Sequence, residues 1–290
     1  MEDIDAVLTN LREANDSDFF VFVGSINDET ADKFIEILRE KKNKRTNCSL
    51  MLTTYGGDPD SGYRIMRAMK RLYEKINFYV FGSCKSTGTL MALGADEIIM
   101  CDFGEFGPLD IQLAKDDEMS NTSGLNFLQS LTALNDQMFK SFEKSFLNLK
   151  QRSNNSITTK TAAEIGSKLA VGLITPISAQ IDPVKLGEVH RAMQIADHYG
   201  TRLCKDKILI SKLIAGYPSH GFVIDFEESK DIFPNVRWVN DEELIFERYL
   251  SKLLRRQEAD LISELLLEKE HKKEEAINNF VDLYQQETSI

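Results

Sequence analysis

Residues 49–57, SLMLTTYGG, run from an apolar segment into two glycines and decide the fold that we expect. An apolar run that ends in Gly56-Gly57 is typical of a buried strand followed by a turn. A second apolar run, residues 77–82, leads to Ser86, which opens a segment of small residues with helical character. A strand that ends in bare backbone and a later strand-to-helix turn with a hydroxyl can form an oxyanion hole beside a nucleophile. The first hypothesis is therefore hydrolysis.

Apolar runs and helical segments alternate from residue 19 to residue 100. The apolar runs predict strands at residues 19–26, 49–54, 78–81 and 97–100. Apolar residues at helical spacing predict a helix after the cap Asn27-Asp28-Glu29, and further helices at residues 60–73 and 86–93. Such an alternation indicates right-handed βαβ units around a buried, mostly parallel sheet. We therefore expect an α/β protein.

The rest of the chain is predicted to be mainly helical. From Gly124 to about Ala215 one helical periodicity follows another, and a leucine stripe predicts one long amphipathic helix from Asp241 to about Tyr284. The polar residues 114–123 are typical of an exposed loop. The expected organisation is an N-terminal helical segment at 1–17, an α/β domain at 18–240 with a helical insertion at about 124–215, and a C-terminal helical extension at 241–290.

Composition limits the classes of partner. The net charge of -11 argues against a nucleic-acid or anionic membrane surface, because phosphate binding needs clustered Lys and Arg. The acidic start of the chain is unlike a signal peptide, and no apolar stretch approaches the about 18 residues of a spanning helix. The four cysteines form no CxxC pair. These features predict a reduced protein of the cytoplasm.

Several ordered motifs carry a resemblance to a known family. They are LTTYGGDPDSG at 52–62, FGSCKSTGTLMALGA at 81–95, GPLDIQ at 107–112, DPVKLGE at 182–188 with RAM at 191–193, and YPSHGF at 217–222. The first two look like the paired motifs of the Clp protease/crotonase fold, a ββα spiral. The whole set, from about residue 18 to residue 240, is most similar to the serine dehydrogenase proteinase family among the signal-peptide-peptidase-A-like serine peptidases.

The resemblance implies a site and an activity. Ser86 would be the nucleophile, and the backbone N–H groups of Gly57 and Thr87 would surround the oxyanion. An extended or unfolded peptide would bind along the strand end at Tyr55 and Gly56. The implied protein is an ATP-independent serine endopeptidase that forms an acyl-enzyme and assembles as a homo-oligomer. The sequence has no GxGxxG fingerprint and no metal-ligand spacing, so we expect no cofactor and no metal.

The general base has two candidate sources. His220 and Asp110 occupy the positions where the resembling Clp proteolytic subunit has its aspartate and its histidine, so the two partner types are exchanged in a Ser86, His220, Asp110 triad. A lysine base, as in signal peptide peptidases, is the alternative, and the candidates are Lys140, Lys144 and Lys168. Lys85 adjoins Ser86, but adjacent side chains on a turn diverge, which argues against a direct role.

Other interpretations of the same residues stay open. Taken alone, Ser86 would most simply cap a helix through its hydroxyl, Gly56-Gly57 would be a plain turn, and His220 and Asp110 would be a loop residue and a turn cap. A crotonase-like acyl-CoA enzyme uses the same oxyanion hole without a serine nucleophile. A catalytically silent scaffold that binds peptides is the third possibility.

Overall fold

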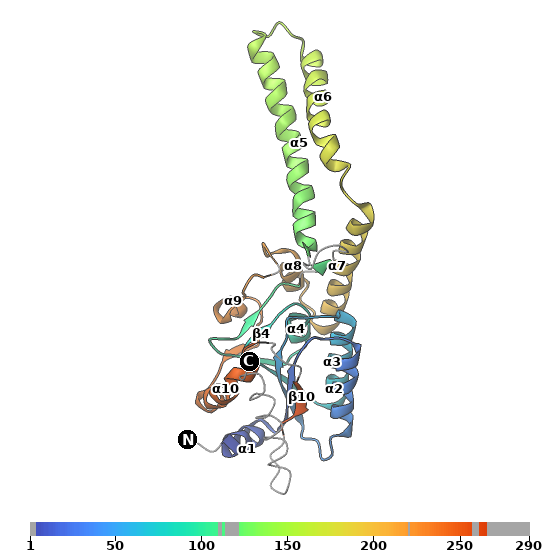
Figure 1. Ribbon diagram of the computed structural model, residues 1–290. Coiled ribbons are helices and arrows are strands. Elements are labelled where there is room, and N and C mark those ends of the chain that lie inside the picture. Colours follow the sequence, from blue (N-terminus) through green and yellow to red (C-terminus); the bar gives the residue numbers. More distant parts are fainter. Residues whose placement is uncertain (1–3, 110–111, 114–121, 220, 257–260, 266–290) are drawn as a thin grey trace, which may run out of the picture. The chain divides into compact units, whose positions relative to one another are not determined.

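The chain folds into two compact units. The computed structural model describes residues 4–109, 112–113, 122–219, 221–256 and 261–265. Unit 1 comprises Met1–Phe106 and Val223–Ile290, and unit 2 comprises Gly107–Phe222 (Figure 1). Unit 1 is therefore interrupted in the sequence by unit 2. The domain boundaries expected from the sequence stay a prediction.

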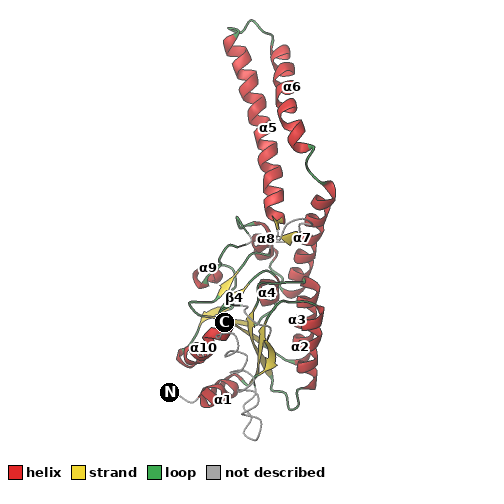
Figure 2. Cartoon of the chain, viewed as in Figure 1, coloured by secondary structure: helices red, strands yellow, loops and turns green. Residues whose placement is uncertain are grey.

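Unit 1 is built on a six-stranded sheet with the order β10-β1-β2-β3-β5-β9. Figure 2 draws the strands in yellow. Neighbouring strands from β1 to β9 are parallel, and only β10 runs antiparallel, to β1. The predicted mostly parallel sheet is thus confirmed. The strands are β1 (Ser17–Val23), β2 (Asn47–Thr53), β3 (Ile76–Val80), β5 (Glu97–Met100), β9 (Val236–Trp238) and β10 (Leu261–Glu264).

Alternate side chains of β1 pack into two separate layers of the core, one on each face of the sheet. Phe20 and Phe22 each pack edge-on against Phe34, with ring centroids 5.8 and 5.7 Å apart. Phe34 belongs to α2 (Asp28–Glu40), which contacts α3 (Pro59–Leu72). Side chains of successive strand residues point to opposite faces, so Phe19 faces the other layer. Because both faces are covered, the strand is buried along its whole length and is apolar from Phe19 to Val23.

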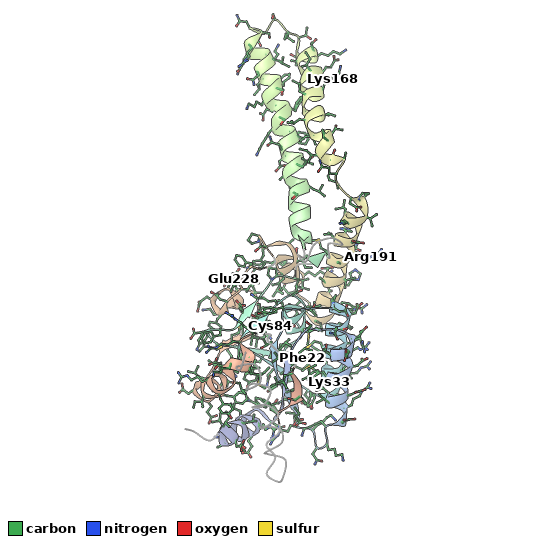
Figure 3. All side chains as sticks on the ribbon, viewed as in Figure 1. Phe22, Lys33, Cys84, Lys168, Arg191 and Glu228 are labelled. Carbon is green, nitrogen blue, oxygen red and sulfur yellow. The ribbon has the colours of Figure 1, made fainter. Side chains whose placement is uncertain are left out.

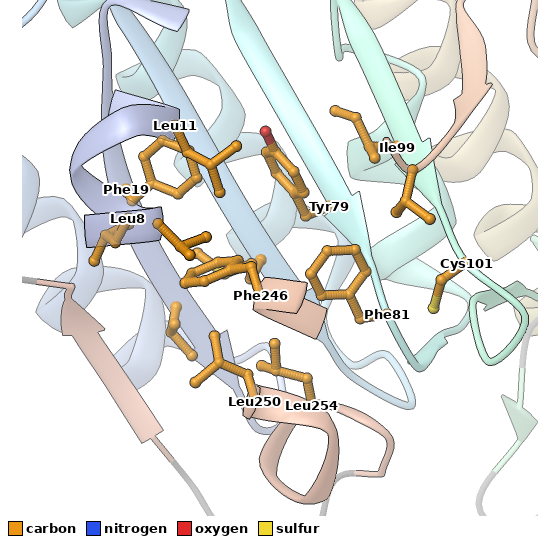
Figure 4. Packing of buried hydrophobic residues seen from close by; sticks show 14 of the residues in the cluster. Leu8, Leu11, Phe19, Tyr79, Phe81, Ile99, Cys101, Phe246, Leu250 and Leu254 are labelled. Atoms are coloured by element: carbon orange, nitrogen blue, oxygen red, sulfur yellow. The ribbon is translucent and has the colours of Figure 1, made fainter. Parts of the chain in front are cut away.

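The second core layer brings together residues from the N-terminal part and the C-terminal part of the chain. Phe19 packs edge-on against Phe246 at 6.1 Å between centroids. Phe246 lies on α10 (Asp241–Leu254), which contacts α1 (Ile4–Asn15). Figure 4 shows the resulting cluster, which includes Leu8, Leu11, Phe19, Tyr79, Phe81, Ile99, Cys101, Phe246, Leu250 and Leu254. Helices near the N-terminus and the C-terminal part of the chain thus cover one face together.

The prediction of one long C-terminal helix from Asp241 to about Tyr284 is wrong for the residues that the structure describes. α10 ends at Leu254, and Leu261–Glu264 forms strand β10. The edge of β1 offers unpaired backbone groups, which β10 takes up, and the Leu265 N–H donates to the Phe19 carbonyl at 2.9 Å. The leucines at 250 and 254 are buried in the cluster rather than left on a free helix face. Residues 266–290 lie outside the described part.

Unit 2 is helical over the range in which periodicity predicted helices. Among its described residues, the helices are α5 (Gly124–Arg152), α6 (Thr159–Ser178), α7 (Pro183–Leu203) and α8 (Lys207–Ala215), and β7 (Gln112–Leu113) pairs with β8 (Thr122–Ser123). α5 and α6 lie side by side (Figure 1). Small residues of α6 such as Gly166 are buried, and a Cβ on Gly166 would lie 3.4 Å from the Phe146 nitrogen, an ordinary van der Waals distance. Among the described residues, no helix is long and apolar enough to cross a membrane.

Candidate active site

Two turns of unit 1 that carry the predicted site are held together by backbone hydrogen bonds. Beyond β2, the Thr54 N–H donates to the Ser83 carbonyl at 2.7 Å, and the Lys85 N–H donates to the Thr54 carbonyl at 2.8 Å. These bonds form a parallel bridge between Thr54 and Cys84, which lies on β4 (Ser83–Cys84) and is labelled in Figure 3. Gly56 and Ser86 each follow this bridge by two residues. The bridge therefore brings the glycine turn beside the serine turn.

Ser86 has a strained backbone. Its torsions are φ 48 and ψ -111, at the entrance of α4 (Thr87–Ala92). This combination lies outside the three regions that residues with a Cβ ordinarily occupy. The Ser86 side chain makes no capping hydrogen bond with the helix, so its interpretation as a plain helix cap is wrong. Strain of this kind gathers at functional sites, and a serine on a sharp strand-to-helix turn, here partly exposed, is the arrangement of a nucleophile elbow.

Gly56 and Gly57 both need to be glycine. Their φ angles are +114 and +143, a region that residues with side chains rarely adopt. A Cβ on Gly56 would lie 2.8 Å from the Cβ of Ser86, and a Cβ on Gly57 would overlap the Ile26 carbonyl oxygen. Gly56 thus lets the main chain approach the Ser86 side chain closely, and Gly57 lets it approach the Ile26 carbonyl, which a plain surface turn does not require.

Two backbone donors remain available at the start of α4 and at the glycine turn. Within the described part of the chain, neither the Gly57 N–H nor the Thr87 N–H donates a hydrogen bond. By contrast, the Gly56 N–H donates to Thr54 Oγ1 at 3.0 Å, and its carbonyl accepts from the Ile26 N–H at 3.0 Å. The Thr87 hydroxyl donates to the Gly57 carbonyl at 2.6 Å and so fixes the two donors relative to each other. The structure therefore brings together Ser86, Gly57 and Thr87.

Lys85 is a buried charge that sequence reasoning set aside. Only 9% of the residue is exposed, and its ammonium lies 3.2 Å from Glu105 Oε1 and donates to the Phe106 carbonyl at 3.2 Å. Ser83 Oγ donates to the same Glu105 oxygen at 2.8 Å. Glu105 and Phe106 form β6, which pairs with β4. The Lys85 ammonium is thus bound to β6, and the expectation that it has no direct role at Ser86 stays a prediction. The signal in the sequence was a single cation within a run of small and apolar residues.

The candidate bases belong to unit 2 and stay a prediction. Asp110 and His220 lie outside the described residues. Lys140 and Lys144 lie on α5, and Lys168, labelled in Figure 3, lies on α6. All three lysines are exposed, whereas a lysine base depends on burial to lose its proton. The side chain of Tyr55, on the expected substrate strand, is 51% exposed.

The cysteines are suited to packing rather than to reaction. Cys48, Cys84 and Cys101 are buried, and Cys204 is partly exposed. Burial raises the pKa of Cys84 well above its usual value, although the nearby Lys85 opposes this shift. A thiol held protonated is a poor nucleophile. In the described ranges, no group of three or more His, Cys, Asp or Glu side chains could hold a metal ion.

Comparisons with known proteins support the fold. Residues 6–100 match the family model of Clp protease, and this range contains Gly57, Ser86 and Thr87. Taken with the parallel sheet, the match supports the Clp protease-like superfamily, and the chain has a Clp protease-like α/β fold. The narrower resemblance to the serine dehydrogenase proteinase family stays a prediction. No curated protein sequence matches the chain.

Solved structures give distant similarities. A mutant of the 1510-N membrane-bound stomatin-specific protease is 21% identical with a TM-score of 0.32, over 51% of this chain and 67% of that one. ClpP1 from Listeria monocytogenes is 14% identical with a TM-score of 0.42, over 81% and 98%. The ClpP catalytic domain from Plasmodium falciparum is 15% identical with a TM-score of 0.28, over 58% and 80%.

Proposed function

We propose that this chain is a serine peptidase of the Clp type, in which Ser86 is the nucleophile and the Gly57 and Thr87 N–H groups form the oxyanion hole. The observation that carries this proposal is the strained Ser86 turn, whose hydroxyl is not used for capping and which contacts the glycine turn. The Clp protease family match over the same residues supports it. The strain has a use in this proposal, because it points the hydroxyl away from the helix.

The proposed reaction proceeds through an acyl-enzyme. Ser86 Oγ forms a bond to the peptide carbonyl carbon while its proton passes to the base, and the negative charge that develops on the carbonyl oxygen accepts hydrogen bonds from Gly57 and Thr87. Collapse of this intermediate breaks the C–N bond, and the leaving amine takes the proton from the base. Water then hydrolyses the ester by the same steps. Each oxyanion donor contributes about 3 kcal/mol to the stability of the transition state.

We assign the base to His220, oriented by Asp110. An imidazole can accept the serine proton, and a carboxylate can hold its tautomer, so this pair fills both roles. A lysine among Lys140, Lys144 and Lys168 is the alternative, which their exposure does not favour. The substrate would be an extended or unfolded peptide beside Tyr55 and Gly57. Both backbone groups of Gly56 are already hydrogen-bonded within the chain, so the main-chain contact that we place here is the one between the scissile carbonyl and the Gly57 N–H of the oxyanion hole.

A fluorophosphonate probe tests the nucleophile. We expect the parent protein to be labelled at Ser86, identified by peptide mass spectrometry, and to cleave casein or an unstructured peptide without ATP. Ser86→Ala should lose both properties, because the substitution removes the proposed nucleophile. Ser178→Ala, at an exposed serine of α6, is the matched control and should keep them.

The results also separate the other functions. Thioester hydration or isomerisation that persists in Ser86→Ala would identify a crotonase-like acyl-CoA enzyme. A parent protein that binds peptides but is neither labelled nor active would be a scaffold. For the base, we expect His220→Ala to slow acylation by about 10²-fold to 10⁴-fold. Parental acylation in His220→Ala together with its loss in Lys140→Met, Lys144→Met or Lys168→Met would assign the base to that lysine.

A further inference from the structure

The strained Ser86 turn needs a neighbour that prevents it from relaxing. A backbone in a sparsely populated conformation persists only where the surrounding structure holds it there, because relaxation would release on the order of 1–3 kcal/mol. The hydroxyl of Ser86 does not supply such a restraint through a helix cap. The restraint must therefore come from its neighbours along the chain or across the sheet.

Lys85 is fixed at three points. Its N–H donates to the Thr54 carbonyl at 2.8 Å, its carbonyl accepts from the Gly88 N–H at 2.8 Å, and its ammonium reaches β6. Lysine is seldom buried unless it is paired, and here the ammonium has one carboxylate and one carbonyl as acceptors. Every polar group of this residue is thus tied to another element of unit 1.

We propose that Lys85 is a positioning residue, which holds the Ser86 turn in its strained conformation by anchoring the preceding residue to Glu105 and Phe106. Without the anchor, Lys85 could rotate and Ser86 could relax toward an ordinary helix-capping conformation. This inference rests on the proposed function for its catalytic consequence. Its structural part, the anchoring of the turn, does not.

β6 is a suitable anchor because it is held firmly from its other side. The Phe106 N–H donates to the Ile224 carbonyl at 2.9 Å, and the Ile224 N–H donates to the Phe106 carbonyl at 3.0 Å. The Phe106 ring packs on Phe233 with 5.0 Å between centroids. The Phe106 carbonyl thus accepts from both Ile224 and Lys85. The anchor of the serine turn is therefore the point where the chain leaves and re-enters unit 1.

Three variants test the anchor. Lys85→Met removes the ammonium and keeps much of the side-chain length, and Glu105→Gln keeps Lys85 but weakens its ion pair. Lys230→Met is the matched control, because Lys230 pairs with Glu227 in an exposed i,i+3 ion pair. The measurements are the second-order rate of Ser86 acylation by a fluorophosphonate, amide hydrogen exchange of residues 83–90, and the thermal midpoint.

We expect Lys85→Met to acylate about 100-fold more slowly at a temperature where it is fully folded, since a displacement of about 1 Å costs that much. Exchange at residues 83–90 should be faster by about tenfold. Glu105→Gln should show smaller changes in the same direction, and Lys230→Met none. A merely structural lysine would lower the thermal midpoint without changing the acylation rate of the folded protein.

Parental acylation and parental exchange in folded Lys85→Met would overturn the proposal. If Lys85→Met does not fold, Glu105→Gln takes its place in the test. Parental acylation and parental exchange in Glu105→Gln would then overturn the proposal. If the parent itself is not acylated, the proposed peptidase function fails. The exchange measurement then still tests the anchor, because it does not depend on catalysis.

Discussion

At the scale of single residues, the contacts of backbone atoms decide what the site tolerates. Gly57 is the clearest case, because its φ of +143 and the adjacent Ile26 carbonyl both exclude a side chain. Ile26 is in turn tied to this turn, since its carbonyl accepts from the Asp58 N–H at 2.7 Å. A Cβ at Gly57 would push the Ile26 carbonyl away from the Asp58 N–H, and the hydrogen bond between these groups joins the ends of β1 and β2.

Gly57→Ala is therefore expected to destabilise the protein by on the order of 3 kcal/mol, from backbone strain plus the overlap with Ile26. Urea unfolding measures this. Gly187→Ala is the matched control, because it lies in α7 with nothing within 4 Å of an added Cβ. It should be stabilising by about 0.5–1 kcal/mol. Equal stabilities of Gly57→Ala and the parent would contradict the close contact.

At the scale of elements, α10 contributes a core helix rather than an extension. Its start is fixed by Asn240, whose side chain accepts from the Glu243 N–H while the Glu243 carboxylate accepts from the Asn240 N–H. The same carboxylate is fully buried and accepts two hydrogen bonds of 2.7 Å from Arg237 of β9. The polar contacts thus attach α10 to the sheet at one end, and the Phe246 and Leu250 side chains attach it along its length.

Phe246→Ala should lower the free energy of unfolding by about 3–5 kcal/mol, because it leaves a cavity between α10 and β1. Tyr249→Ala on the same helix is the control, since this side chain is 65% exposed. It should change stability by less than about 0.5 kcal/mol. Urea unfolding of both variants gives the comparison. A similar effect of the two substitutions would mean that α10 does not pack on the sheet as described.

β10 brings a titratable group into a partly buried position. Burial raises the pKa of Glu264 above its usual value, and the ion pairs with Lys41 at 3.0 Å and Arg12 at 3.7 Å offset this only in part. The folded protein therefore binds this proton more tightly than the unfolded chain does. The stabilising contribution is present below the ordinary glutamate pKa of about 4.3 and is lost as the pH rises through the folded value.

Glu264→Gln cannot ionise at this position and should remove that pH dependence. We expect the free energy of unfolding of the variant, relative to the parent, to increase from about pH 4 to about pH 7. Urea unfolding at several pH values measures the difference. Glu29→Gln, an exposed residue in the first turn of α2, should show no such increase. A relative stability that falls with pH would contradict the burial of Glu264.

At the scale of the whole molecule, an antiparallel bridge closes the gap in unit 1. Phe106 and Ile224 exchange two backbone hydrogen bonds, so the chain leaves unit 1 and returns to it at neighbouring points. A long insertion between adjacent ends costs little in loop-closure entropy. Unit 1 also contains its complete sheet and both core layers.

Replacement of residues 107–222 by a short glycine-rich linker should therefore yield a protein that still folds. We expect a cooperative thermal transition by circular dichroism. Peptide cleavage should be lost, because His220, Asp110 and the three candidate lysines are all removed. A non-cooperative or insoluble product would show that unit 1 depends on the helical unit. Retained cleavage would place the base within unit 1.

Local sequence pattern was sufficient to predict four of the parallel strands and the positions of the two turns. Apolar runs such as residues 19–23 have one stable environment, a strand buried on both faces, so local pattern suffices there. The sequence predicts Gly56, Gly57 and Ser86 as site residues because they lie within an ordered set of motifs that resembles a known family. Their spatial contact follows from the bridge between neighbouring parallel segments.

The strand at Leu261–Glu264, the strain at Ser86 and the burial of Lys85 depend on tertiary contacts. The spacing of Leu250, Leu254, Leu261 and Leu265 fits a helix, but the free edge of β1 gives residues 261–264 hydrogen-bond partners from the far end of the chain. Lys85 likewise meets Glu105 and Phe106 only after β4 and β6 pair. Local periodicity carries no information on such distant partners, and these partners determine the strand conformation of residues 261–264 and the burial of Lys85.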